Sequence, residues 1–517
     1  YLVRNKVINL TGAFTGEIGI TAATAPTASS DVTITSGYST YGMDGTFTSD
    51  NNSYEITLSP NEDTSGSEIA LALHVHSYTD KVTTEATCES EGVRTYTCLD
   101  CGDSYTEKID MLGHRYGTPT WTWTTGNTSA TASATCSVCN DENKETVTPS
   151  FDSSTGKLTA TATVGGVSSQ DEKTIAATVT LSDTTYYYTT FAAAWSAATG
   201  ASTSAESRAT VTLYADVGAA EYTAAAGSSC LSVTRGNYIT LDLNGHTIDR
   251  ELTETTATSD GYVIKVLGNL IINDSSGNNS GKITGGYNSG DYSGGIYVVG
   301  GTLTLNGGSI TGNTVTGTYG GGGVYVFNDG TFEMNGGVIS YNTATQSQYG
   351  GGGVNAGSGS FTMNGGTISN NTAYYGGGIR AGAFTNLLKI TGGTITNNTA
   401  TSHGGGVYVF SGTIYLSGSA QITGNVKSDG TANNVYLESG KVITLTDIFT
   451  GSVGLTTYTK PTVGSDVMVT SGYSNYGTGG TFTSDNDSYV IIKSNNELAL
   501  HVHSYTCLLY TSPSPRD

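Results

Sequence analysis

Cysteine and histidine residues gather between positions 74 and 139, where two blocks of sequence share one order of residues. Each block opens with His-x-Tyr, at His76 and His114, and closes with Cys-x-x-Cys. Two cysteines at that spacing are common zinc ligands in small structural sites. A redox-active pair would instead need a βαβ context, which this part of the sequence lacks. The pattern therefore predicts a structural role for both blocks.

The two blocks differ in how many ligands they supply. The first offers a Cys₃His set made of His76, Cys88, Cys98 and Cys101. The second offers His114, Cys136 and Cys139, so its site is either incomplete or borrows a ligand. Disulfides, which are natural in an exported chain, and thiols that stay reduced in an anaerobic habitat are the alternatives to zinc. Some such support is expected, because about 40 residues cannot build a sufficient core.

A second candidate site is a set of mostly aromatic residues that recurs at one position of a repeated sequence. Its members are Tyr297, Tyr325, Asn355, Arg380, Tyr408 and Tyr436. Stacked parallel strands would place them on one exposed face, about 4.8 Å apart per coil. Such a ladder could bind host glycans or protein partners. The alternative is that tyrosines at exposed strand positions only stabilise the sheet, since Asn355 and Arg380 interrupt the ladder.

Acidic residues do not form the pairs that glycan-degrading chemistry needs, because that chemistry requires two groups a few ångströms apart. Between residues 290 and 430 the acids are Asp291, Asp329, Glu333 and Asp429, and none lies one repeat from another at the same position. Upstream, Asp242 is expected to project outward from a strand and Asp274 to lie at a turn. The sequence therefore predicts no enzyme. The alternative is a polysaccharide lyase or hydrolase whose catalytic residues lie in a lost part of the chain.

A sequence repeat that occurs in five copies between Gly295 and Asn425 is expected to position these residues. An isoleucine recurs at intervals of 29, 29, 27 and 27 residues, at Ile310, Ile339, Ile368, Ile395 and Ile422. A fixed period of this size is typical of stacked repeats. Each copy holds three short runs with two-residue alternation, separated by glycine, which predicts three strands per coil of a parallel β-helix.

Apolar residues at matching positions predict the core of that β-helix. The three columns are Ile296, Val324, Val354, Ile379 and Val407; Leu303, Phe332, Phe361, Leu388 and Ile414; and Leu305, Met334, Met363, Ile390 and Leu416. One asparagine also recurs in each copy, at Asn313, Asn342, Asn371, Asn398 and Asn425. Stacked amides of this kind can hydrogen-bond from coil to coil.

Several motifs resemble those of known surface proteins. Gly-Gly-[Gly/Ala]-[Ile/Val] followed by hydrophobic-x-x-Asn, as in Ile368–Asn371, resembles the repeats of the polymorphic outer-membrane proteins, which are β-helical adhesins. The chain also looks like β-helical surface proteins of anaerobic gut bacteria, and its Cys/His blocks resemble a module of clostridial surface proteins. These resemblances imply an all-β, right-handed parallel β-helix with an adhesive role at the cell surface.

Composition narrows the class of protein further. The chain has 517 residues, of which 71 are glycine and only 12% are charged, and its formal net charge is −22. A strongly acidic chain is not expected to bind nucleic acid, which attracts basic patches. The sequence lacks the run of about 18 apolar residues that predicts a transmembrane helix. The resemblance to surface proteins implies an extracellular, cell-surface location.

The two ends of the chain repeat each other. Lys6–Thr11 matches Lys441–Thr446, and Ser30–Ser39 matches Ser465–Ser474, both at an offset of 435 residues. We therefore expect a fragment of a tandem array whose unit has roughly 430 residues. Residues 507–517 break the match and look like a translated sequencing adaptor, which is excluded from fold reasoning.

These observations predict seven segments in order. They are the last coils and cap of a preceding β-helix (1–73), a first Cys/His block (74–113), a second Cys/His block with a β-extension (114–184), a capping helix (185–200), the parallel β-helix (201–456), its C-terminal cap with the start of the next linker (457–506), and the adaptor-derived tail (507–517). The helix is expected because Phe191, Trp195 and Ala198 recur at helical spacing.

Overall fold

The structure is a computed structural model and describes residues 1–27, 30–38, 46–51, 53–60, 67–73, 75–100, 102–226, 229–345, 349–382, 387–477 and 479–502. The chain divides into two compact units. One consists of Tyr1–Thr120, Ser133–Glu145 and Thr163–Ser168, and the other of Trp121–Ala132, Thr146–Ala162 and Ser169–Asp517. Cys101 and the tail 507–517 lie outside the described residues.

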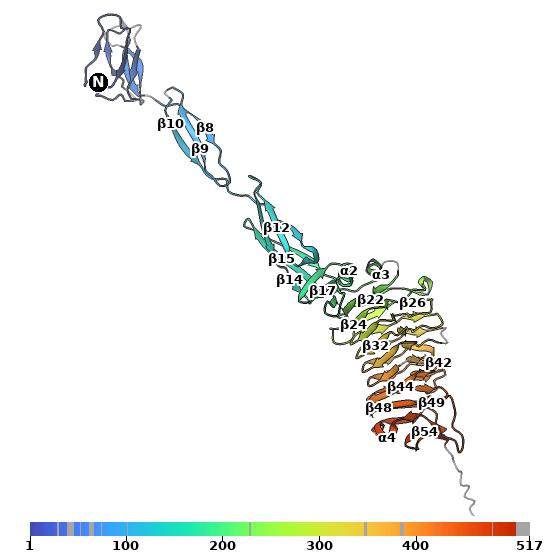
Figure 1. The fold of residues 1–517 in the computed structure, drawn as a ribbon. Helices are drawn as coiled ribbons and strands as arrows, with labels where there is room; N and C mark the ends of the chain where they lie inside the picture. The colour runs from blue at the N-terminus through green and yellow to red at the C-terminus, as the bar shows by residue number, and fades with distance from the viewer. Residues whose placement is uncertain are drawn as a thin grey trace, which may run out of the picture. The chain divides into compact units, whose positions relative to one another are not determined.

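The second unit is built around a parallel β-solenoid (Figure 1). One coil consists of β31 (Val324–Phe327), β32 (Thr331–Met334), β33 (Val338–Ser340) and β34 (Thr343–Ala344). The next coil repeats them as β35 (Val354–Ala356), β36 (Ser360–Met363), β37 (Thr367–Ser369) and β38 (Thr372–Tyr375). Each strand pairs in parallel with its counterpart one coil on. The predicted all-β, parallel β-helix fold is confirmed.

The coil has four strands rather than the predicted three. The fourth is short and forms a six-stranded sheet of its own: β26 (Tyr287–Asn288), β30 (Thr314–Val315), β34, β38, β42 (Thr399–His403) and β46 (Val426–Lys427). Its inward residues are small, and Val315, Ala344 and Ala373 form a separate buried cluster. Four of these six strands have only two residues, which is too little alternation to be recognised from sequence.

The predicted core columns stack in register. Val324 pairs with Val354, and Phe332 with Phe361. The side chains of all three columns are fully buried, and the rings of Phe332 and Phe361 stack with their centroids 4.7 Å apart. Because each coil presents apolar residues to both neighbours, the stack rather than the single coil is the folding unit.

The recurring asparagines form the predicted ladder inside the solenoid. Each of the five is fully buried, and each side-chain amide donates to the Oδ1 of the next rung over 2.9–3.0 Å. The last donation goes to Asn434, whose own amide donates to Asp485 over 2.7 Å. A second ladder, on the exposed side, links Asn273, Asn306, Asn335 and Asn364 over 2.9–3.0 Å.

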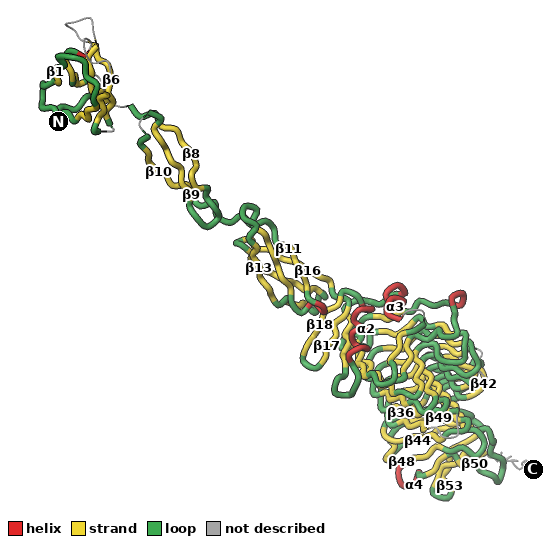
Figure 2. The backbone as a smooth tube through the Cα atoms, turned by 45° about the horizontal axis from the view of Figure 1, so that its top comes forward, coloured by secondary structure: helices red, strands yellow, loops and turns green. Residues whose placement is uncertain are grey.

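Two helices lie where the solenoid begins (Figures 1 and 2). The predicted helix is α2 (Phe191–Ala201), whose N-cap Thr190 accepts a hydrogen bond from the Ala193 N–H. It buries Phe191 and Trp195 in the main core. The second helix, α3 (Ala219–Ala226), was not predicted from sequence, and it buries Tyr222.

At the other end, parallel pairing continues through β51 (Thr470–Ser471) and β52 (Thr481–Ser484). An antiparallel sheet of β50 (Val467–Met468), β54 (Glu497–Val502) and β53 (Tyr489–Ser494), together with α4 (Tyr473–Tyr476), follows this end of the stack. This sheet and helix form a cap, which is needed because the exposed strand edges at the end of a solenoid can pair with other chains.

The first unit opens with the same arrangement. The described strands of residues 1–73 are β1 (Ile8–Asn9), β2 (Glu17–Ile20), β3 (Val32–Thr33), β4 (Thr35–Ser36), β5 (Thr46–Ser49), β6 (Tyr54–Pro60) and β7 (Ser67–Leu73). β1–β4 and β2–β5 pair in parallel, and β3–β7–β6 is antiparallel. The buried Glu68 binds the Thr35 hydroxyl and the backbone of Gly37, as Glu497 binds Thr470 and Gly472.

The Cys/His blocks are small three-stranded sheets. β8 (Tyr78–Thr84), β9 (Gly92–Cys98) and β10 (Ser104–Ile109) form the first sheet. β11 (Thr120–Trp123), β12 (Ala130–Thr135) and β13 (Glu142–Val147) form the second, and β14 (Ser150–Asp152), β15 (Lys157–Val164) and β16 (Val167–Thr174) form the third. Among the described residues, no helix is long and apolar enough to cross a membrane.

Candidate functional site

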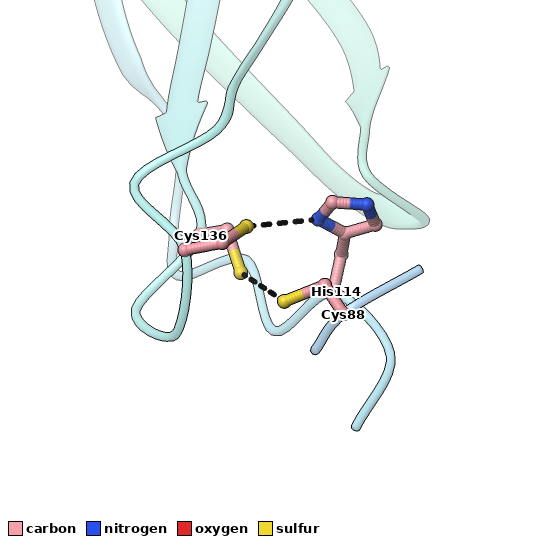
Figure 3. A group of neighbouring side chains, drawn as sticks. Cys88, His114 and Cys136 are labelled. Atoms are coloured by element: carbon pink, nitrogen blue, oxygen red, sulfur yellow. Dashed lines mark hydrogen bonds between the residues drawn. The ribbon is translucent and has the colours of Figure 1, made fainter. Parts of the chain in front are cut away.

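Four potential metal ligands converge at the junction of the two Cys/His blocks, all within the first compact unit. Cys88 lies in the connection between β8 and β9, and His114 lies between β10 and β11. Cys136 and Cys139 lie on the turn between β12 and β13. Figure 3 shows the side chains of Cys88, His114 and Cys136 pointing toward one another from these separate segments.

The distances among these four residues match a tetrahedral zinc site. Their ligand atoms all lie within 4.8 Å of one another. The Sγ atoms of Cys88 and Cys136 are 3.8 Å apart, and Cys139 Sγ lies 3.4 Å from His114 Nδ1. Zinc bonds of about 2.3 Å to sulfur and about 2.0 Å to nitrogen place tetrahedral ligands about 3.8 Å (S–S) and about 3.5 Å (S–N) apart. The residues therefore fit this ion, and the Cys88–Cys136 separation is too long for a disulfide, whose sulfurs lie about 2.05 Å apart.

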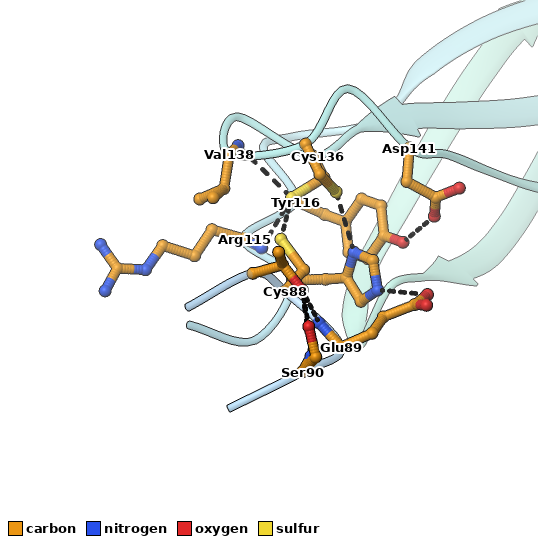
Figure 4. A network of polar contacts seen from close by, with 11 residues as sticks. Cys88, Glu89, Ser90, Arg115, Tyr116, Cys136, Val138 and Asp141 are labelled. Carbon is orange, nitrogen blue, oxygen red and sulfur yellow. Dashed lines mark hydrogen bonds and ion pairs between the residues drawn. The ribbon is translucent and has the colours of Figure 1, made fainter. Parts of the chain in front are cut away.

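The two buried thiols have opposite pKa shifts. Burial and hydrogen bonds to the neighbouring cysteines raise the pKa of Cys88 to about 12. For Cys136, burial acts in the same direction but is outweighed by backbone hydrogen bonds and by His114, which lower its pKa to about 5. The backbone N–H groups of Arg115 and Val138 point at the Cys136 sulfur over 3.3 and 3.4 Å (Figure 4). Cys136 is thus prepared to be a thiolate, the form that binds metal.

The second nitrogen of His114 is held by a carboxylate. His114 Nε2 lies 3.4 Å from Glu89 Oε1, and this contact orients the ring so that Nδ1 faces the sulfurs (Figure 3). The His114 ring stacks on Tyr116, with centroids 5.5 Å apart, and the Tyr116 hydroxyl donates to Asp141 over 2.6 Å. A carboxylate behind a histidine ligand is the usual support for zinc-binding imidazole.

The first block has the same local arrangement 38 residues earlier. His76 stacks on Tyr78, whose hydroxyl donates to Asp103 over 2.9 Å. The Cys98 N–H donates to the Asp103 carbonyl over 2.7 Å, as the Cys136 N–H does to Asp141. His76 and Cys98 therefore occupy the positions that His114 and Cys136 occupy in the second block.

The structure corrects the predicted place of Cys88. The sequence pattern groups it with His76, Cys98 and Cys101, but in the structure Cys88 precedes β9 and Cys98 ends it. A seven-residue strand is about 20 Å long, so these two sulfurs cannot bind one ion. Cys88 instead supplies the ligand that the second block was expected to lack. Cys101 lies outside the described residues, so the first predicted set is described only at His76 and Cys98.

The second candidate, the mostly aromatic set, stacks in register as expected. Its consecutive members are paired across the first strands of successive coils: Tyr297–Tyr325, Tyr325–Asn355, Asn355–Arg380, Arg380–Tyr408 and Tyr408–Tyr436. The prediction that these side chains are exposed is wrong. All six are buried, and burial raises the pKa of Tyr297 and of Tyr436 to about 12.

A second row of rings covers this buried column. Tyr292 stacks on Tyr297 with centroids 4.7 Å apart, Tyr375 on Tyr408 at 4.6 Å, and His403 on Tyr436 at 4.2 Å. Tyr319 and Tyr349 stack on each other at 5.2 Å. The covering residues are Tyr292, Tyr319, Tyr349, Tyr375 and His403. Sequence reasoning missed them, although in each copy an aromatic residue stands directly before the small-residue run.

No known protein-family model matches the chain, and neither a curated protein nor a solved structure matches it.

Proposed function

We propose that this chain is an exported, cell-surface β-helical protein with a structural and adhesive role, which presents the aromatic side of its solenoid to host glycans or proteins. The observation that carries the proposal is the row of rings over the buried column. Tyr292, Tyr319 and Tyr349 keep 40, 49 and 40% of their surface exposed. Rings of this kind offer flat apolar faces with a polar edge, which suits stacking on sugars or docking on a protein.

The placement of the carboxylates supports a role without catalysis. Asp242 Oδ1 accepts the N–H groups of Asn244 and Ser275 over 3.0 and 2.9 Å. Asp274 accepts those of Gly245 and Gly281 over 2.7 and 2.8 Å. Both carboxylates thus stabilise turns between strands. In strand pairing, the partner of Asp242 is Asn273 rather than Asp274.

We also propose that a structural zinc ion is bound by Cys88, His114, Cys136 and Cys139. The ligand distances and the Glu89 carboxylate behind His114 support this assignment. A bound ion would join the β8–β9 connection of the first block to the β12–β13 turn of the second. Neither block has a large core of its own, so this cross-link would supply stability that burial of apolar surface does not.

A glycan array combined with a degradation assay tests the main proposal. The purified chain is expected to bind glycans without releasing new reducing ends. Replacing Tyr319 and Tyr349 together by alanine should weaken that binding, whereas Tyr341→Asn should not. Tyr341 is a suitable control because it is an exposed tyrosine at a positive φ, which asparagine tolerates, and it does not belong to the covering row. Turnover of a polysaccharide would contradict the proposal and favour the lyase or hydrolase alternative.

A further inference from the structure

Arg380 is a buried cation without a carboxylate partner. It lies in the middle of β39 (Ile379–Ala381), at the fourth position of the buried column, and only 6% of its surface is exposed. Its Nε has no hydrogen-bond partner. Within the described part of the chain, no acidic side chain forms an ion pair with it. Burying an unpaired charge is costly, so an arginine kept in this state calls for a physical explanation.

Aromatic rings surround the guanidinium. Its Cζ lies 5.6 Å from the centroid of the Tyr349 ring and 5.9 Å from that of Phe410. Cation–π contacts offset part of the cost of burial but leave the Nε N–H without an acceptor. Burial accordingly lowers the pKa of Arg380 below its ordinary value.

Glycines keep the space around this arginine open. A Cβ on Gly382 would lie 2.0 Å from Arg380 Nη1, and a Cβ on Gly357 would lie 2.6 Å from the Tyr325 ring. Two cavities, of about 190 and 280 Å³, share Tyr349, Arg380 and Phe410 as lining residues. The buried Oδ1 of Asn355, which also lacks a hydrogen-bond partner, belongs to a residue that lines the larger one.

We propose that these two cavities bind a sugar residue that carries a carboxylate, with the carboxylate on the Arg380 guanidinium and the sugar ring against Tyr349 and Phe410. The inference rests on the proposed glycan-binding role and names the class of glycan. Arginine binds carboxylates through two parallel N–H···O bonds, and aromatic faces pack on the apolar faces of sugars. Among the described residues that line the cavities, Arg380 is the only charged one.

The charge of the whole chain limits how acidic the ligand can be. At a net charge of −22 the protein repels a long polyanion, whereas a glycan with one acidic unit loses little from this repulsion. The cavities are also of a size that suits one or two sugar rings rather than a long chain of them. The expected ligand is therefore a glycan with an isolated acidic sugar, either a terminal uronate or a terminal sialate.

The test compares acidic glycans with partners whose carboxylate has been converted to the methyl ester. Glucuronate-terminated and N-acetylneuraminate-terminated oligosaccharides serve as separate probes, and titration of the full chain gives the affinity. At least one acid is expected to bind about tenfold or more tightly than its ester, because a charge-assisted bidentate contact is lost. Arg380→Gln should remove that preference. Lys389→Gln is the matched control, since it removes the same charge from the next strand of the same coil, β40 (Leu387–Ile390).

A second variant protects the test against misfolding. Gly382→Ala retains the arginine but places a methyl group 2.0 Å from the present position of Nη1, which the flexible end of the arginine must leave. It should therefore also reduce the acid-over-ester preference, while thermal melting stays close to wild type. Equal binding of acids and esters by the wild-type chain, with loss of binding in the Tyr319 and Tyr349 variant, would overturn this inference and leave the adhesive proposal standing. Binding of no glycan at all would overturn both.

Discussion

At the scale of single residues, the Cys/His ligand types were predictable but their grouping was not. Cys-x-x-Cys and His-x-Tyr are local patterns, and a sequence shows them directly. Whether Cys88 belongs with the ligands of the first block or with those of the second depends on which end of the β8–β9 hairpin it occupies. Strand β9 carries the chain away from Cys88 before Cys98 is reached, and only the fold shows that separation.

The ligand grouping gives a direct prediction about zinc. Cys88→Ser should abolish the zinc held by His114, Cys136 and Cys139, because it removes one of four ligands that lie within 4.8 Å of one another. Cys98→Ser should leave that ion in place. Metal content of the purified variants, measured by elemental analysis, separates the two. Retention of that zinc in Cys88→Ser, together with its loss in Cys98→Ser, would restore the grouping expected from sequence.

Burial lowers the pKa of His403 below its ordinary value of 6.5. Below pH 6.5 the unfolded chain therefore binds a proton that the folded chain does not, and this residue makes stability fall as the pH falls. His403→Phe retains the stacking on Tyr436 but removes the titration, so its melting temperature should decrease less than that of the wild type between pH 7.5 and 5.5. An unchanged pH dependence in the variant would show that His403 is not held in its neutral form.

At the scale of elements, two-residue alternation identified the three longer strands and their core columns, since one side of each strand is buried. It did not reveal the fourth strand, which is as short as two residues, or α3, whose run of alanines lacks a clear apolar stripe. The outer column was placed correctly in register, yet its burial depends on turns that fold back over the sheet. Strand periodicity contains no information about those turns.

The buried asparagine ladder should contribute more to stability than the exposed one. Asn371→Ala removes the donor to Asn398 and Ile339 and the acceptor for Asn342, all buried. Each orphaned buried group costs about 1–3 kcal/mol, so we expect a loss of about 2–5 kcal/mol in the free energy of unfolding. Asn364→Ala, in the exposed ladder, should cost under about 1 kcal/mol because water replaces its partners. Chemical denaturation of both variants provides the comparison, and equal losses would contradict a stabilising internal ladder.

At the scale of the whole molecule, the sequence repetition between the two ends is matched by structure. Thr35, Gly37 and Glu68 form the hydrogen bonds that Thr470, Gly472 and Glu497 form near the other end. Both ends also place an antiparallel sheet beside parallel pairs. Two segments with the same cap arrangement fit the expected tandem array, in which solenoids alternate with Cys/His blocks.

Every functional assignment to the solenoid depends on coils that stack in parallel, one strand spacing per coil, because only that stacking aligns the aromatic column and its covering row. Distances between spin labels test it most directly. Asn269, Thr302 and Thr413 occupy the same register position in three strands of one sheet: β24 (Asn269–Asn273), β28 (Thr302–Leu305) and β44 (Thr413–Gly418). β24 lies five coils from β44, and β28 lies four coils from it. Labels carried by non-canonical residues at 269 and 413 should lie about 24 Å apart, and those at 302 and 413 about 19 Å apart. Equal distances for the two pairs, or a longer one for the second, would contradict the stack and the surface assigned to it.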